Sequence, residues 1–134
     1  MMEKKIILVK DIMRTSFGRI DREETVRTAL SMMADSNARA LIVNKRDDHD
    51  ELGIVVLADI AKQVLALDKS PDRVNVYEIM SKPVIQVAPT MNIRYCARLF
   101  DRFGLERAPV VEHGEVQGIV SYHVLVLRGL MQYL

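Results

Sequence analysis

Hydrophobic residues along the chain form two kinds of pattern, short continuous runs and longer stretches of helical spacing. The continuous runs are typical of buried strands and occupy 40–43, 54–57, 108–111 and 119–120. Two stretches place apolar residues at i, i+3, i+4 and i+7, which predicts amphipathic helices with one buried face. Their members are Val26, Ala29, Leu30 and Met33, and then Ile93, Cys96, Ala97 and Phe100. Thr25 and Asn92 precede these stretches as predicted N-caps.

One short motif occurs twice at a strand-to-helix corner. A Gly-Ile-Val triplet at 53–55 leads into a predicted helix at 57–67. An identical triplet at 118–120 leads into a second predicted helix at 122–134. The two corners differ at their polar positions, because the first carries an aspartate without a hydroxyl and the second a hydroxyl without an aspartate.

The duplication extends over the whole chain. A short helical turn predicted at 9–13 recurs at 76–80, so that each half has the order helical turn, β, α, β, β, α. Residues 68–75 are polar and contain a proline, which predicts a linker. The sequence therefore predicts a first repeat at 1–67, including an N-terminal lead-in, and a second repeat at 76–134.

Composition narrows the class of protein. A hydrophobic content of 49% supports a packed core, and a charged content of 28% supports a soluble surface. The net charge of +1 gives no indication of a nucleic-acid or acidic-membrane partner. No run of 18 apolar residues is present, so no membrane-spanning helix is expected. The single cysteine excludes an internal disulfide and favours a reducing, cytoplasmic compartment.

The residues that commonly carry catalysis are poorly placed for it. Cys96 belongs to the apolar stripe of its helix, and His49 and His113 fall in predicted hairpin loops. No His, Cys, Asp or Glu pair has the spacing of a metal site, and no glycine-rich phosphate loop is present. We therefore expect neither an enzyme nor a metal-binding protein.

The chain resembles a tandem pair of cystathionine-β-synthase (CBS) domains, also called a Bateman module. The likeness lies in the Asp-Ile-Met opening at 11–13, the Arg-Ala-Leu-Ile-Val and Arg-Ala-Pro-Val-Val strands at 39–43 and 107–111, and the two Gly-Ile-Val corners. The resemblance implies an α+β fold of two βαββα repeats related by pseudo-twofold symmetry, with their sheets packed together and two clefts between them. Such pairs bind adenosine-containing ligands (AMP, ADP, ATP, S-adenosylmethionine, sometimes NAD), require no cofactor, dimerise and regulate other proteins.

The family pattern for such a corner is Gly-x-x-(Ser/Thr)-x-x-Asp, in which the carboxylate binds the ribose diol and the hydroxyl contacts phosphate. Carried over to the first cleft, Asp59 would bind ribose and Arg39 phosphate, while Val56 occupies the hydroxyl position. The adenine side would come from the opening of the other repeat, namely Met80, Ser81, Lys82, Pro83 and Val84.

The second cleft carries a different set. Ser121 and Arg107 would contact phosphate, with His123 nearby, and Val124 replaces the ribose aspartate. The opposite side would be formed by Met13, Arg14, Thr15 and Ser16. A hydrogen bond to a charged group contributes about 1.5–3 kcal/mol, or roughly ten- to hundredfold in affinity. The first cleft is therefore the preferred site.

Each candidate residue also has a simpler interpretation. Asp59 is an acid in the first turn of a helix, where the helix dipole favours it. Arg39 and Arg107 fit solvated or ion-paired arginines equally, and Ser121 is an ordinary N-cap residue.

The last predicted helix, at 122–134, is apolar on more than one face, which predicts a homodimer formed through the terminal helices. Coverage of both faces within one chain is the alternative. The leading hypothesis is a stand-alone regulatory module that binds an adenosine-containing ligand and acts on a separate, unidentified protein. The rival hypothesis is a dimerisation or protein-interaction scaffold with vestigial nucleotide clefts and no ligand.

Overall fold

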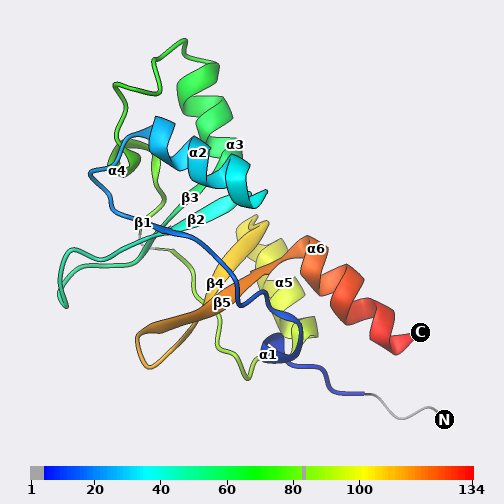
Figure 1. The fold of residues 1–134 in the computed structure, drawn as a ribbon. Coiled ribbons are helices and arrows are strands. Elements are labelled where there is room, and N and C mark those ends of the chain that lie inside the picture. Colours follow the sequence, from blue (N-terminus) through cyan, green and yellow to red (C-terminus); the bar gives the residue numbers. More distant parts are fainter. Residues whose placement is uncertain (1–4, 83) are drawn as a thin grey trace. The chain divides into compact units, whose positions relative to one another are not determined.

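The computed structural model describes residues 5–82 and 84–134 (Figure 1). Its contacts divide the chain into two compact units. One unit is continuous and runs over Phe17–Val84, while the other combines Met1–Ser16 with Ile85–Leu134. Each unit has its own cluster of buried apolar side chains. No helix in the described part of the chain is both long enough and apolar enough to cross a membrane.

The unit Phe17–Val84 contains a three-stranded sheet in the order β1-β2-β3. β1 (Arg19–Ile20) is parallel to β2 (Ala40–Val43), which is antiparallel to β3 (Gly53–Val56). The helix α2 (Val26–Ser36) connects β1 to β2. The predicted N-cap is confirmed, because the Thr25 hydroxyl accepts a hydrogen bond from the Thr28 N–H at 3.2 Å. The predicted stripe is confirmed as well, since its members Val26, Ala29 and Met33 are buried.

The predicted linker is packed against the first turn of α2. Val74 is buried, and its carbonyl accepts a hydrogen bond from the Val26 N–H at 2.8 Å. The Arg27 guanidinium forms an ion pair with Asp72. The short helix α4 (Val76–Ile79) follows and adds two buried side chains to the same core.

The second unit contains a two-stranded antiparallel sheet of β4 (Arg107–Glu112) and β5 (Glu115–Ser121). His113 and Gly114 both have positive φ, 52° and 76°, as a two-residue hairpin turn of this hand requires. The hairpin loop predicted at His113 is thereby confirmed, and it is a tight two-residue turn. Two helices, α1 (Val9–Ile12) and α5 (Ile93–Phe103), complete the core around the buried Phe100.

The two closing helices are less regular than the sequence predicts. α3 (Leu57–Ile60) continues as a π-helical turn over Ala61–Leu65. α6 (Tyr122–Val124) continues as a π-helical turn, Leu125–Gly129, and a 3₁₀ turn, Leu130–Tyr133. Apolar spacing over two or three turns does not distinguish bonds to i−4 from bonds to i−5, so periodicity alone indicated continuous α-helices.

The opening segments are exchanged between the repeats. α1 belongs to the first repeat in sequence, yet it packs in the core around β4 and β5. α4 belongs to the second repeat and packs in the core around β1, β2 and β3. The predicted repeats at 1–67 and 76–134 describe the duplication in the sequence, whereas the compact units divide the chain after Ser16 and after Val84.

Candidate functional site

In the unit Phe17–Val84, the first Gly-Ile-Val triplet forms β3 and receives the segment 80–82 along its edge. The Ser81 N–H donates to the Ile54 carbonyl at 2.8 Å, and the Ile54 N–H donates to the Ser81 carbonyl at 3.1 Å. A Cβ at Gly53 would lie 3.1 Å from Met80 Sδ, 3.2 Å from Val43 Cβ on the neighbouring strand and 3.4 Å from the Ser81 carbonyl oxygen. The glycine therefore permits the close approach of segment 80–82 to β3.

Two of the predicted ligand residues lie at the other end of the β2–β3 hairpin. The Arg39 carbonyl accepts a hydrogen bond from the Leu57 N–H at 2.9 Å, which places Arg39 beside the start of α3. Asp59 lies in the first turn of α3 and is half-buried, whereas Arg39 is exposed. Within the described residues, neither the Asp59 carboxylate nor the Arg39 guanidinium has a hydrogen bond or ion pair. Both groups are therefore available to a ligand.

Of the residues predicted on the adenine side, Met80, Lys82 and Val84 are half-buried and Ser81 is exposed. Met80 packs against the core of this unit. Pro83 lies outside the described residues. The backbone pairing of segment 80–82 with β3 brings Met80 to the same unit as Asp59.

Lys82 has a partner that sequence reasoning did not predict. Its ammonium donates a hydrogen bond to Asp50, whose side chain is only 5% exposed. Arg22 Nη1 lies 3.3 Å and Arg46 Nε 3.5 Å from the same carboxylate, and the Arg46 N–H also donates to it at 2.8 Å. The hydrogen bonds from Lys82 and the Arg46 backbone hold the pKa of Asp50 well below its usual range. The sequence gives only a weak signal for this cluster, because an acid in a long polar loop is normally solvated.

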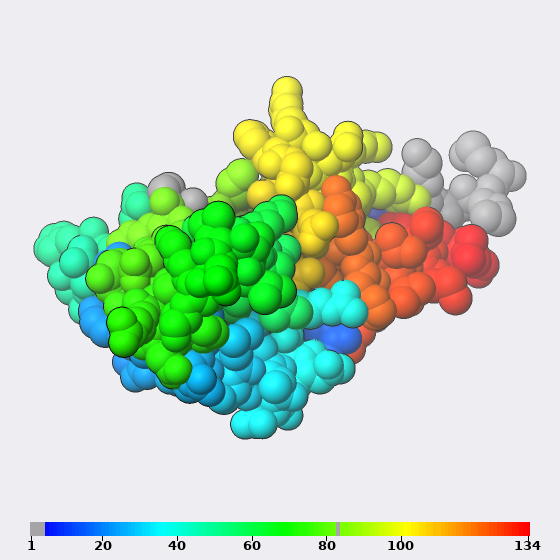
Figure 2. Space-filling model, turned by 90° about the horizontal axis from the view of Figure 1, so that it is seen from above, coloured from blue at the N-terminus to red at the C-terminus, as the bar shows by residue number. Residues whose placement is uncertain are grey.

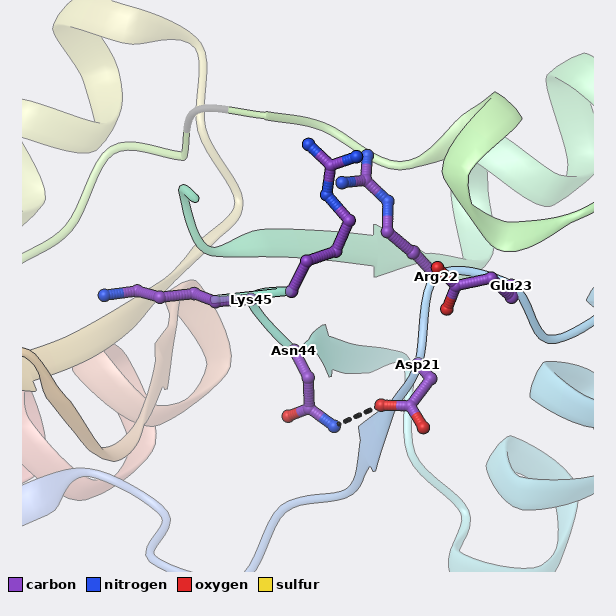
Figure 3. A pocket seen from close by; sticks show the side chains of 6 residues that line it. Asp21, Arg22, Glu23, Asn44 and Lys45 are labelled. Atoms are coloured by element: carbon purple, nitrogen blue, oxygen red, sulfur yellow. Dashed lines mark hydrogen bonds between the residues drawn. The ribbon is translucent and has the colours of Figure 1, made fainter. Parts of the chain in front are cut away.

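A pocket of about 410 Å³ lies beside this cluster (Figure 3). Its lining is polar and consists of Asp21, Arg22, Glu23, Asn44, Lys45 and Arg46. Asn44 Nδ2 donates to Asp21 Oδ1 at 2.9 Å, and in Figure 3 the Arg22 guanidinium points away from this pair. The pocket contains none of the ligand residues predicted from the sequence.

The second unit repeats the glycine arrangement at β5. The Arg14 N–H donates to the Ile119 carbonyl at 3.0 Å, and the Ile119 N–H donates to the Arg14 carbonyl at 2.9 Å. A Cβ at Gly118 would lie 2.5 Å from the Arg14 carbonyl oxygen and 2.9 Å from Met13 Sδ. In both units, therefore, the Gly-Ile-Val triplet forms backbone hydrogen bonds with the opening segment of the other repeat.

The polar residues of the second set are arranged differently from those of the first. Ser121 pairs with Arg107 in the β4–β5 register, and its hydroxyl accepts a hydrogen bond from the Val124 N–H at 3.3 Å. Ser121 is thus the N-cap of α6, as its simpler interpretation states. Val124, at the position of the ribose aspartate, is buried. The remaining predicted members are the half-buried Met13 and the exposed Arg14, Thr15, Ser16 and His123.

The structure confirms that Cys96 is a core residue. Its side chain is fully buried, and burial raises the pKa of the thiol to about 11, so that it is protonated at neutral pH. Among the described residues no group of three or more His, Cys, Asp or Glu side chains is arranged to hold a metal ion.

Comparison with known proteins identifies the architecture. The family model described as the CBS domain matches two segments, residues 9–66 and 76–127. The chain belongs to the CBS domain family. The two matches confirm the tandem pair that the sequence motifs indicated, and the mixed helices and small sheets are those of an α+β CBS fold.

Three relatives show how far the likeness extends. An uncharacterised protein of Methanopyrus kandleri, MK0525, is 33% identical over 100 residues, which are 74% of this chain and 50% of that protein. This CBS pair therefore spans about half the length of that relative. A hexameric CBS-CP12 protein from bloom-forming cyanobacteria has a TM-score of 0.92 at 33% identity, covering 96% of this chain and 74% of that one. The CBS pair of MJ0100, solved with 5′-methylthioadenosine and S-adenosylmethionine, has a TM-score of 0.82 at 26% identity, covering 97% and 100%.

Proposed function

We propose that this CBS pair is a regulatory module that binds an adenosine-containing ligand in the unit Phe17–Val84. The observation that carries the proposal is the half-buried Asp59 carboxylate, which has no partner among the described residues and lies in the unit that holds segment 80–82. The two ligands of the MJ0100 pair share an adenine and a ribose diol, and a carboxylate is a strong acceptor for such a diol. AMP, ADP, ATP and S-adenosylmethionine all carry the same group.

The other members of the first set have complementary roles in this proposal. Arg39 lies beside the start of α3, where its guanidinium would meet a phosphate or a carboxylate of the ligand. Met80, Ser81 and Val84 would form the adenine side, with Pro83 between them. Lys82 would act through its ion pair with Asp50.

The second set is proposed as a weaker site. It contains Arg14, Arg107 and His123 but no carboxylate, so it favours an anionic group over a ribose diol. The Ser121 hydroxyl already accepts the α6 cap bond, although its second lone pair remains available. Met13, Thr15 and Ser16 would border this site.

We also propose a homodimer formed through the terminal helices. The C-terminal segment lies on the surface of its unit in Figure 2, drawn in red. Its exposed apolar side chains are Tyr122, Val126, Leu127, Leu130, Met131 and Leu134. In this proposal the dimer binds a separate regulated protein, and ligand binding changes the activity of that protein. The chain itself catalyses no reaction. We propose the cytoplasm as its compartment, because adenine nucleotides are available there.

A thermal-shift panel tests the proposed function. The probes are AMP, ADP, ATP, S-adenosylmethionine, 5′-methylthioadenosine and NAD. A ligand at a hundred times its dissociation constant adds about 2.7 kcal/mol to the free energy of unfolding, which raises the melting temperature by several degrees in a chain of this size. We expect at least one adenosine compound to do so. No shift with any of them at millimolar concentration would favour the scaffold with vestigial clefts.

A further inference from the structure

The ion cluster around Asp50 connects three separate parts of the unit Phe17–Val84. Arg22 comes from the connection between β1 and α2, Arg46 from the β2–β3 loop, and Lys82 from segment 80–82. The side chains of Asp50, Arg22 and Lys82 are 5%, 15% and 20% exposed. Charges shielded to this degree interact more strongly than exposed pairs, because water and salt screen them less.

Lys82 immediately follows Ser81, the residue whose backbone hydrogen bonds hold segment 80–82 on β3. On its N-terminal side, the segment is fixed by α4, whose Val76 and Ile79 are buried. On its C-terminal side, Lys82 itself pairs with Asp50, and the next buried residue that the structure describes along the chain is Val87. Between these two anchors lie the two backbone hydrogen bonds of Ser81 with Ile54.

We propose that Asp50 is a positioning residue for the ligand site: by binding Lys82, it keeps segment 80–82 docked on β3. Asp50 is suited to this role because Arg22, Arg46 and the Arg46 N–H already fix its carboxylate. The inference rests on the proposed function in one respect, since it assumes that Met80 and Ser81 border the ligand. The docking itself requires no ligand.

Loss of the Lys82–Asp50 ion pair would raise the apparent dissociation constant of the ligand by an amount that follows from the docked fraction of segment 80–82. If segment 80–82 is docked in only a fraction of the molecules, the apparent dissociation constant rises by the inverse of that fraction. Docking in about a tenth of the molecules therefore weakens binding about tenfold. The same change exposes the Ser81 and Ile54 amides to hydrogen exchange.

The test uses Lys82→Met, which keeps an unbranched chain and leaves Asp50 paired with two arginines. Asp50→Asn is the second variant, and Asp72→Asn is the matched control, because the Arg27–Asp72 pair lies in the same unit but is 65% and 54% exposed. Amide exchange of Ser81 is measured without ligand, and the dissociation constants of AMP and S-adenosylmethionine are measured by titration.

We expect Lys82→Met to leave segment 80–82 docked in about a tenth of the molecules, so that ligand binding weakens about tenfold. Exchange at Ser81, which follows the undocked fraction, should then approach that of an unprotected amide. The Asp72→Asn control should change neither quantity. The double variant Lys82→Met/Asp50→Asn should exchange at Ser81 no faster than Lys82→Met alone, because Asp50 acts through Lys82.

Unchanged Ser81 exchange in folded Lys82→Met overturns the inference, whether or not a ligand binds. Exchange at Ser81 as fast as that of an unprotected amide, together with unchanged affinity, overturns the link between segment 80–82 and the ligand site. If exchange is faster in Lys82→Met but the wild type binds none of the adenosine compounds of the thermal-shift panel, the proposed function is refuted, and with it the ligand role of Asp50, while the docking contact stands.

Discussion

At the scale of single residues, the two glycines of the repeated corner explain why the motif is duplicated. Each stands where the backbone of an opening segment approaches a strand, and both lack the φ > 0 conformation that only glycine adopts easily. Glycine is therefore needed at both positions because a side chain would not fit, and the space for an added Cβ differs between Gly53 and Gly118. At Gly118 an added Cβ meets a backbone carbonyl, whereas at Gly53 its nearest neighbour is the flexible Met80 side chain.

Alanine substitutions test this difference. We expect Gly118→Ala to lower the free energy of unfolding by about 2 kcal/mol, because backbone must shift to relieve the overlap. Gly53→Ala should cost less, about 1 kcal/mol, because its closest contact, the Met80 side chain, can move and alanine reduces the entropy of the unfolded chain. Val43 Cβ, at 3.2 Å, needs to shift by only a few tenths of an ångström. Urea denaturation of the two variants measures both values. Equal losses, or a larger loss at Gly53, would contradict the geometry.

At the scale of elements, the C-terminal helical segment carries apolar surface that its own unit leaves exposed. Val124 and Leu125 are buried, whereas Leu127 and Met131, one helical turn apart, are 54% and 56% exposed. Apolar residues on opposite sides of one helix indicate two covered faces. One of these faces packs in the core, and a second copy of the chain would cover the other.

A charge introduced on this face tests the homodimer. We expect the wild type to be dimeric by light scattering during gel filtration and Leu127→Glu to be monomeric, because burying an unpaired carboxylate is strongly unfavourable. Tyr95→Glu is the matched control, since Tyr95 is exposed on α5, outside the terminal helices. A monomeric wild type, or a Leu127→Glu protein that stays dimeric, would refute the proposed interface.

At the scale of the whole molecule, local sequence patterns predicted most elements correctly. The helical stripes, the caps at Thr25 and Asn92 and the turn at His113 depend on residues close in the chain. The tandem CBS architecture followed from their repeated order and is shown by the family match.

Contacts between distant residues were less accessible to sequence reasoning. The exchange of α1 and α4 between the two units depends on packing between segments far apart in the chain. The Asp50 cluster likewise joins Arg22 and Lys82, which are 28 and 32 residues from Asp50. No local sequence pattern distinguishes the Asp50–Arg22 and Asp50–Lys82 ion pairs from solvated charges. The ligand roles of Asp59, Arg39 and Ser121 stay predictions for the same reason, because they depend on a molecule that the chain's own contacts do not specify.

Ligand binding at Asp59 is measured by calorimetric titration of AMP and, separately, S-adenosylmethionine into the wild type, Asp59→Ala and Ser121→Ala. We expect at least one compound to bind the wild type and Asp59→Ala to weaken its binding tenfold or more, about the contribution of a hydrogen bond to a charged group. Ser121→Ala should change its affinity less than about threefold. Binding that is unaffected by Asp59→Ala but lost in Ser121→Ala would place the ligand in the other unit and contradict a ligand site at Asp59.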